Sequence, residues 1–265
     1  VDADTNEVLH ARYADEPRYP ASLTKAMTLY MVFDALDAGE ISLNEQIKVS
    51  AHAASQPPSA LRLRAGSTIS VGDAISALVT KSANDVAVVI AERLGGSESR
   101  FATLMTAKAK SLGMTRTTFR NASGLPDAGM RTTARDMAVL SLALRRDYPQ
   151  YYSYFRLKSF EYRGKTIRGH NKILDMVSGA DGIKTGYTRA SGSNLTASAH
   201  RGNKRIIATI FGGTSGPSRD AQMAELLDMG FRQAGNNVAV RPPSKPPYMG
   251  NSGLGASAPL VANNE

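Results

Sequence analysis

Residues 19–28 read YPASLTKAMT and contain the predicted start of an amphipathic helix. Pro20 ends the segment before it, and apolar residues then recur every three or four positions as far as Leu36, with Gly39 closing the run. Residues i and i+3 lie on one face of a helix, so we expect the Lys25 amine to reach the Ser22 hydroxyl. An S-x-x-K motif is weak evidence alone, because typical residue usage gives about one in a chain of this length.

Two further short motifs follow it, Ser82-Ala83-Asn84 and Lys184-Thr185-Gly186. The S-x-N pattern also occurs at residues 42–44 and identifies little alone, whereas K-T-G occurs only once. The three motifs appear in a fixed order, the first at a helix start and the third just before predicted strands. Together they are a specific signal for an activated serine.

The chemistry explains why these residue types would be combined. A serine hydroxyl is a poor nucleophile until a base takes its proton. For Lys25 to be that base, its amine must be neutral near pH 7, about three pH units below its usual pKa. Burial, the positive end of the helix and a nearby like charge from Lys184 would all lower the pKa of Lys25.

The other motif residues suit substrate binding and proton transfer. Ser82 can relay a proton to a leaving amine, and the Asn84 amide offers a substrate both a donor and an acceptor. Lys184 and Thr185 can bind a carboxylate, while Gly186 allows a substrate backbone to approach a strand edge. The structural alternative is that Ser22 caps a helix, Ser82 lies in a turn and Lys184 is a surface lysine.

At this point the chain resembles the penicillin-recognising serine acyltransferases, and within them the low-molecular-weight penicillin-binding proteins that are D-alanyl-D-alanine carboxypeptidases. The resemblance covers about residues 1 to 235 and goes well beyond the three motifs. The matching segments are YPASLTKAMT at 19–28, KSAND at 81–85, FRNASGLP at 119–126, TARDMA at 133–138 and DGIKTGYT at 181–188.

The resemblance implies an α/β (α+β) fold of the β-lactamase and transpeptidase type, an antiparallel sheet flanked by helices with an all-helical lobe. We expect a catalytic domain over 1–235, with an α/β lobe at about 1–48 and 160–235 and a helical lobe at about 49–159. A Pro-rich extension over 236–265 would follow this domain. Apolar spacing independently predicts a hairpin of 195–199 with 205–211. It also predicts helices over 71–80, 84–94, 97–112, 133–145 and 218–234.

The implied activity is removal of the terminal D-alanine from a peptidoglycan stem peptide through an acyl-enzyme on Ser22. Lys25 would be the base, and Ser82 and Asn84 would serve proton transfer and alignment. Lys184 and Thr185 would face the terminal carboxylate beside Gly186, and the backbone N–H groups of Ser22 and Tyr187 would form the oxyanion hole. β-Lactams should acylate Ser22 and leave slowly. No metal or organic cofactor is implied.

Two departures from the family pattern stand out. Many members place an Arg about fourteen residues before K-T-G to bind the substrate carboxylate. Here His170 is nearest that position, flanked by Arg168 and Lys172. Any of these three residues is a candidate for binding the carboxylate. The family's C-terminal β-domain and membrane anchor are expected to be missing or cut away. Peripheral membrane association would then involve segments outside this chain, at the periplasmic or extracytoplasmic face of a bacterial membrane.

Composition narrows the alternatives. The 32 Lys and Arg residues exceed the 23 Asp and Glu residues, giving a net charge of +9 over 265 residues. No basic block of five residues and no Trp are present, so we expect no nucleic-acid partner. The absence of Cys excludes a thiolate nucleophile. The four histidines are scattered and lack a catalytic motif.

Two rival functions use the same fold. A serine β-lactamase needs an efficient deacylating base, in class A a Glu within E-x-x-L-N, and none of Glu92, Glu98 or Glu161 lies in that pattern. A non-catalytic peptidoglycan-binding protein would have no need of the activated serine that S-x-x-K predicts.

Overall fold

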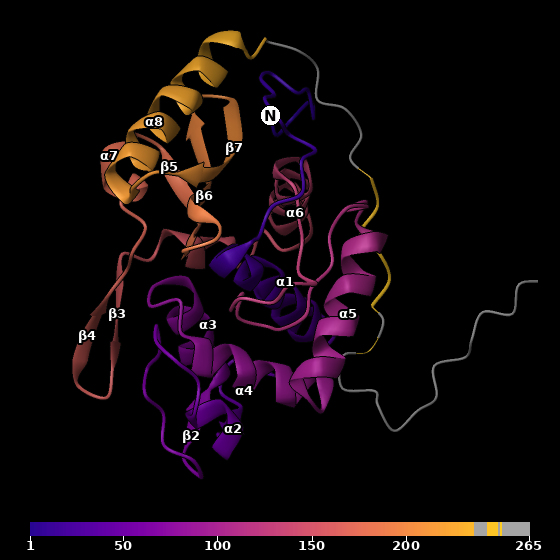
Figure 1. The fold of residues 1–265 in the computed structure, drawn as a ribbon, viewed down its shortest axis with the longest axis vertical. Helices are drawn as coiled ribbons and strands as arrows, with labels where there is room; N and C mark the ends of the chain where they lie inside the picture. The colour runs from indigo at the N-terminus through magenta and orange to yellow at the C-terminus, as the bar shows by residue number, and fades with distance from the viewer. Residues whose placement is uncertain (236–242, 249, 251–265) are drawn as a thin grey trace, which may run out of the picture.

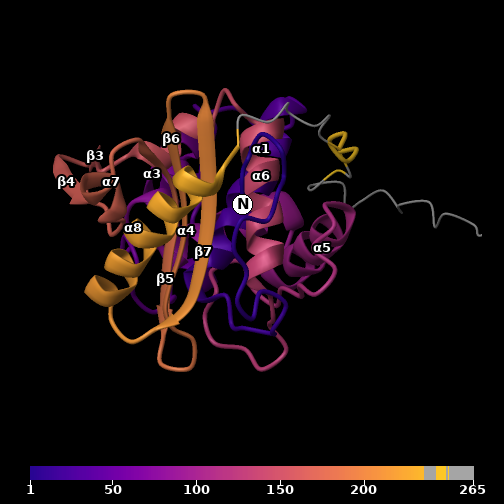
Figure 2. The same ribbon diagram turned by 90° about the horizontal axis from the view of Figure 1, so that it is seen from above.

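The computed structural model describes residues 1–235, 243–248 and 250. Its largest sheet within these residues has three antiparallel strands in the order β5-β6-β7 (Figure 1). The strands are β5 (Ala180–Thr188), β6 (Gly192–Arg201) and β7 (Lys204–Gly213). Helix α8 (Gly216–Gln233) covers one face, and the other face meets the helical part of the molecule (Figure 2). This arrangement leaves β5 as an edge strand of the sheet.

Helix α1 (Thr24–Asp37) runs through the centre of the helical part, and every residue from Thr24 to Ala35 is buried. It packs in one core with α3 (Val71–Val79), α4 (Asn84–Gly95), α5 (Glu98–Ser111) and α6 (Ala134–Asp147). The smaller elements are η1 (Ala21–Leu23), β1 (Gln46–Lys48), α2 (Ala51–Ala54), β2 (Thr68–Ser70), η2 (Tyr152–Arg156), β3 (Ser159–Tyr162), β4 (Lys165–Arg168) and α7 (Ile173–Met176).

Hydroxyl side chains start several of these helices. Ser70, Ser97, Thr133 and Ser215 each accept a hydrogen bond from the backbone N–H three residues later, which satisfies one of the free donors of the first turn. Ser22 does not act in this way, because neither η1 nor α1 has a side-chain cap. The alternative that Ser22 is a helix cap is therefore wrong.

The predicted helices and the β6–β7 hairpin are confirmed to within a few residues. The predicted first helix begins at Thr24, because residues 21–23 form a 3₁₀ turn ahead of it. The strand pairs β1–β2 and β3–β4 were not predicted as such. Most of the predicted Pro-rich extension lies outside the described residues, and no helix within the described residues is long and apolar enough to cross a membrane.

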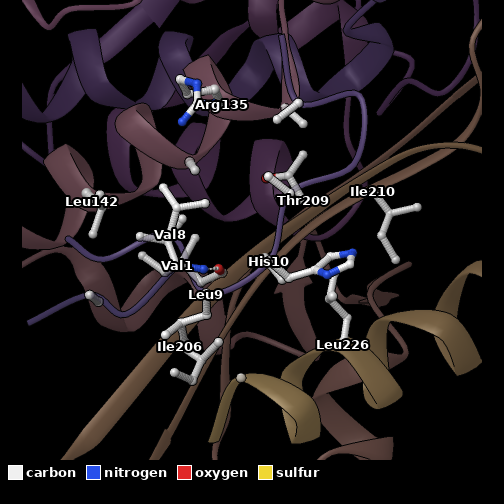
Figure 3. A pocket seen from close by; sticks show the side chains of 18 of the residues that line it. Val1, Val8, Leu9, His10, Arg135, Leu142, Ile206, Thr209, Ile210 and Leu226 are labelled. Carbon is white, nitrogen blue, oxygen red and sulfur yellow. Dashed lines mark hydrogen bonds between the residues drawn. The ribbon is translucent and has the colours of Figure 1, made fainter. Parts of the chain in front are cut away.

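A groove of about 1350 Å³ lies between the N-terminal segment, β7, α6 and α8. Figure 3 shows Val8, Leu9 and His10 beside it, with Ile206 of β7 and Leu226 of α8. None of the candidate site residues lines this groove. The residues predicted to carry chemistry gather elsewhere, where η1 meets β5.

Candidate active site

Ser22 lies in η1, where backbone from two other segments presses against this turn. Gly124 has φ +86°, and a Cβ there would lie 1.8 Å from the Ala21 carbonyl oxygen. A Cβ on Gly186 of β5 would lie 3.1 Å from the backbone nitrogens of Ser22 and Leu23. These two glycines allow the turn to fit between the loop at residue 124 and the edge strand β5. The close fit of the turn holds the half-buried Ser22 in place.

Lys25 occupies the first turn of α1 and is completely buried. Its Nζ lies 3.2 Å from Ser22 Oγ, as the i, i+3 spacing predicted. It also donates to Asn84 Oδ1 at 2.8 Å and to the Ser123 carbonyl at 2.6 Å. None of these three neighbours is a carboxylate. Burial, followed by the positive charge of Lys184, holds the pKa of Lys25 well below its usual value, while Asp85 acts in the opposite direction.

Asn84 is the first residue of α4, and its amide is fixed at both ends. Its Oδ1 accepts from Lys25, and its Nδ2 donates to the Pro57 carbonyl at 2.8 Å. Its backbone N–H donates to the Ser59 carbonyl at 2.7 Å. The segment containing residues 57–59 therefore sets the position of the amide that meets the lysine.

Ser82 lies just before α4, in a left-handed backbone conformation with φ +57°. Its side chain is buried, and its Oγ has no hydrogen-bond partner among the described residues. A buried hydroxyl without a partner is uncommon, and unsatisfied polar groups often mark a functional site. A left-handed conformation in a residue other than glycine is also uncommon.

Lys184 and Thr185 lie on β5 and are buried. Lys184 Nζ donates to the Thr185 carbonyl at 3.0 Å. Burial, together with the charge of Arg219, lowers the pKa of Lys184 to about 7. Near neutral pH this lysine is therefore only partly protonated. The structural alternative, in which Lys184 is a surface lysine, is wrong.

Tyr187, His170 and Arg168, which were also predicted to bind substrate, are exposed to solvent. Tyr187 is 67 % exposed. His170 is exposed, and partial desolvation, followed by the charges of Lys184 and Lys81, lowers its pKa; Lys172 and Lys25 contribute in the same direction. The neighbouring Arg168 is also exposed at the end of β4. Several lysine side chains therefore lie near His170.

Sequence reasoning missed two groups that hold this site together. The Ser123 carbonyl binds the Lys25 amine, and both oxygens of the buried Asp85 accept backbone hydrogen bonds from residues 61 and 63. Both residues lie in segments that carried the family resemblance, Ser123 in FRNASGLP and Asp85 in KSAND. For Ser123 that resemblance was the only available signal, because every residue has a backbone carbonyl and its role leaves no trace in the residue type.

Known proteins resemble this chain over most of its length. A family model described as D-alanyl-D-alanine carboxypeptidase, peptidase S11, matches residues 1–215. DacF of Bacillus subtilis is 35% identical over 88% of this chain and 61% of its own length. DacC of Escherichia coli is 36% identical over 91% of this chain and 62% of its own length. The chain thus spans about three fifths of these two relatives.

Solved structures give the same result. The D-alanyl-D-alanine carboxypeptidase DacD from Francisella tularensis has a TM-score of 0.83 at 29% identity, covering 87% of this chain and 68% of that one. Penicillin-binding protein D2 from Listeria monocytogenes, in its cefotaxime-bound form, has a TM-score of 0.79 at 32% identity, covering 87% and 94%. The fold is thus the α/β fold of the penicillin-binding proteins. On this match of sequence and structure, the chain belongs to the peptidase S11 family, the family of D-alanyl-D-alanine carboxypeptidases.

Proposed function

We propose that this protein is a serine D-alanyl-D-alanine carboxypeptidase that removes the terminal D-alanine from peptidoglycan stem peptides. One observation carries the proposal: the three polar neighbours of the buried Lys25 amine are a hydroxyl, an amide oxygen and a backbone carbonyl. A neutral amine has two N–H groups and one lone pair. The N–H groups suit Asn84 and Ser123, which leaves the lone pair to accept the proton of Ser22.

In the proposed acylation step, Ser22 Oγ attacks the carbonyl carbon of the penultimate D-alanine as its proton moves to Lys25. The backbone N–H groups of Ser22 and Tyr187 stabilise the resulting oxyanion. The C–N bond then breaks, and the proton passes through Ser82 to the amine of the departing D-alanine. The unpartnered Ser82 hydroxyl is available for this relay. Water finally attacks the ester and restores Ser22.

Substrate binding in this scheme depends on β5. Protonated Lys184 and the Thr185 hydroxyl bind the terminal carboxylate, and the ammonium groups around His170 attract it. We assign His170 the place taken by Arg in many family members. We further propose that residues 1–235 form the catalytic unit, with α/β and helical lobes as expected from the sequence. Peptidoglycan lies outside the cytoplasm, so the enzyme would act at the periplasmic or extracytoplasmic face of the membrane.

The direct test uses a labelled penicillin, which mimics the D-Ala-D-Ala end. We expect a stable adduct on the peptide that contains Ser22, release of D-alanine from a stem-peptide analogue, and loss of both in Ser22→Ala. Decay of the adduct within seconds would indicate a β-lactamase instead. Absence of both adduct and D-alanine release would favour the non-catalytic peptidoglycan-binding protein.

A further inference from the structure

A second, smaller pocket of about 250 Å³ lies directly beside the serine turn. Three segments form it: residues 19–21 ahead of Ser22, residues 124–130, and the β5–β6 turn with Thr188 and Ala190. Its walls are largely apolar and include Leu125, Pro126 and Met130. None of the motif residues Lys25, Asn84 and Lys184 belongs to it.

The direction of a bound peptide brings its third residue to this pocket, an argument that rests on the proposed function. With the carboxylate at Lys184 and Thr185 and the scissile carbonyl at Tyr187, the acyl part of the substrate must continue along β5 toward Thr188. An extended peptide added to an edge strand presents side chains alternately to its two sides. The residue before the penultimate D-alanine therefore arrives beside Thr188, which lines the pocket.

Asp127 gives this pocket its chemical character. It is exposed, and its Oδ1 accepts the Gly129 N–H at 2.7 Å. Its Oδ2 has no hydrogen-bond or ion-pair partner within the described ranges. Asp127 is the only carboxylate among the lining residues. The Arg120 side chain lies near the same loop, because a Cβ on Gly129 would lie 2.7 Å from Arg120 Nε and 3.3 Å from Asp127 Oδ1. The free Oδ2 of Asp127 is thus the carboxylate atom left for a cationic ligand.

We propose that this pocket is a subsite for an aliphatic side chain that ends in a primary ammonium, which Asp127 binds. In a peptidoglycan stem this ligand is the diamino acid at the third position. Its methylene groups would pack on Leu125, Pro126 and Met130, and its ammonium would meet the free carboxylate oxygen. An exposed ion pair contributes up to about fivefold in affinity. The subsite therefore selects among substrates and leaves the chemistry at Ser22 unaltered.

The test compares two donors that differ by a single charge, L-lysyl-D-Ala-D-Ala and its Nε-acetyl analogue, each with a blocked N-terminus. We expect the KM of the lysine donor to be about three- to fivefold lower in the unmodified enzyme. In Asp127→Asn the two KM values should become equal. The matched control is Asp228→Asn on α8, which pairs with Arg201 and should preserve the preference.

Different results separate the possible failures. Release of D-alanine from both donors with equal KM in the unmodified enzyme, or a preference that survives in Asp127→Asn, would overturn the subsite alone. No release from either donor and no penicillin adduct on Ser22 would overturn the proposed function, and the subsite with it. A diaminopimelyl donor distinguishes the two natural side chains. A KM as low as that of the lysine donor shows that the pocket accepts the additional carboxylate of the diaminopimelyl side chain. A higher KM restricts the subsite to lysine.

Discussion

Two buried lysines at this site have opposite requirements. In the proposed mechanism, Lys25 must be neutral to accept a proton, whereas Lys184 must be charged to bind a carboxylate. Burial lowers the pKa of both, and a positive charge adds to this effect in each case, that of Lys184 for Lys25 and that of Arg219 for Lys184. An ammonium on Lys184 therefore makes an ammonium on Lys25 harder to form. The pKa of Lys184 is about 7, so Lys184 is mostly charged on the acid side of pH 7.

The pKa of Lys184 predicts the alkaline side of the pH profile. Lys184 has a pKa of about 7, so it is charged below that pH and loses its charge above it. We expect kcat/KM to fall above about pH 7. The fall in kcat should occur at higher pH, because bound carboxylate stabilises the ammonium. In Lys184→Arg, whose guanidinium stays charged, the alkaline fall should move upward by more than one pH unit. A fall that stays near pH 7 in this variant would contradict the assignment.

At the scale of elements, the N-terminus of α4 and the segment before it form one unit. Asp85 Oδ1 accepts from the Leu61 N–H at 3.1 Å and from the Val86 N–H at 2.9 Å, and Oδ2 accepts from the Leu63 N–H at 3.0 Å. The same segment supplies the carbonyl groups that hold Asn84. Asp85 is therefore a positioning residue that acts on Lys25 through Asn84 and through its own charge.

We predict that Asp85→Asn lowers kcat/KM by about tenfold, because small misplacements of a reacting group are costly. Loss of the negative charge also lowers the pKa of Lys25, since Asp85 raises it in the native protein. The acid limb of the kcat/KM profile should therefore move to lower pH. The control is Asp136→Asn, which removes another buried carboxylate from the first turn of a helix. It should lower stability to a similar degree but leave the acid limb in place.

These elements also show what the sequence could and could not predict. The i, i+3 spacing of Ser22 and Lys25 and the period of the helices are local, so they were predicted and are confirmed. The 3₁₀ turn around Ser22 is imposed by the close approach of Gly124 and Gly186, which lie more than 100 residues away. The Ser123 carbonyl reaches Lys25 across 98 residues. Such contacts depend on the assembled fold and leave no periodic pattern.

At the scale of the whole molecule, residues 243–248 return to the helical part and lie along α5 (Figure 1). Lys245 Nζ lies 2.6 Å from Asp37 Oδ2 and 4.5 Å from the centre of the Tyr148 ring. The Pro247 carbonyl accepts from Lys108, whose buried ammonium also pairs with Asp34. This segment therefore covers a buried ion pair at the far end of α1 from the active site.

We predict that Lys245→Ala lowers the free energy of unfolding by about 1 kcal/mol, because it removes an ion pair and a cation–π contact together. For a chain of this size the melting temperature should fall by about 2–4 °C. Lys158→Ala is the control, since it removes only an exposed pair with Asp175. It should leave the melting temperature within about 1 °C. Equal melting temperatures for Lys245→Ala and the native protein, measured by calorimetry, would show that the segment contributes no stability.

The two glycines beside the serine turn also bear on antibiotic resistance. Gly124 and Gly186 present only backbone to the turn, and a Cβ at Gly124 would collide with the Ala21 carbonyl. Point mutations usually defeat a drug by exchanging a side chain that the drug touches. A compound that draws its affinity from contacts with the backbone of these two glycines would touch no side chain there that a mutation could exchange. Escape at Gly124 would require the turn that carries Ser22 to move, which in the proposed mechanism would displace the nucleophile.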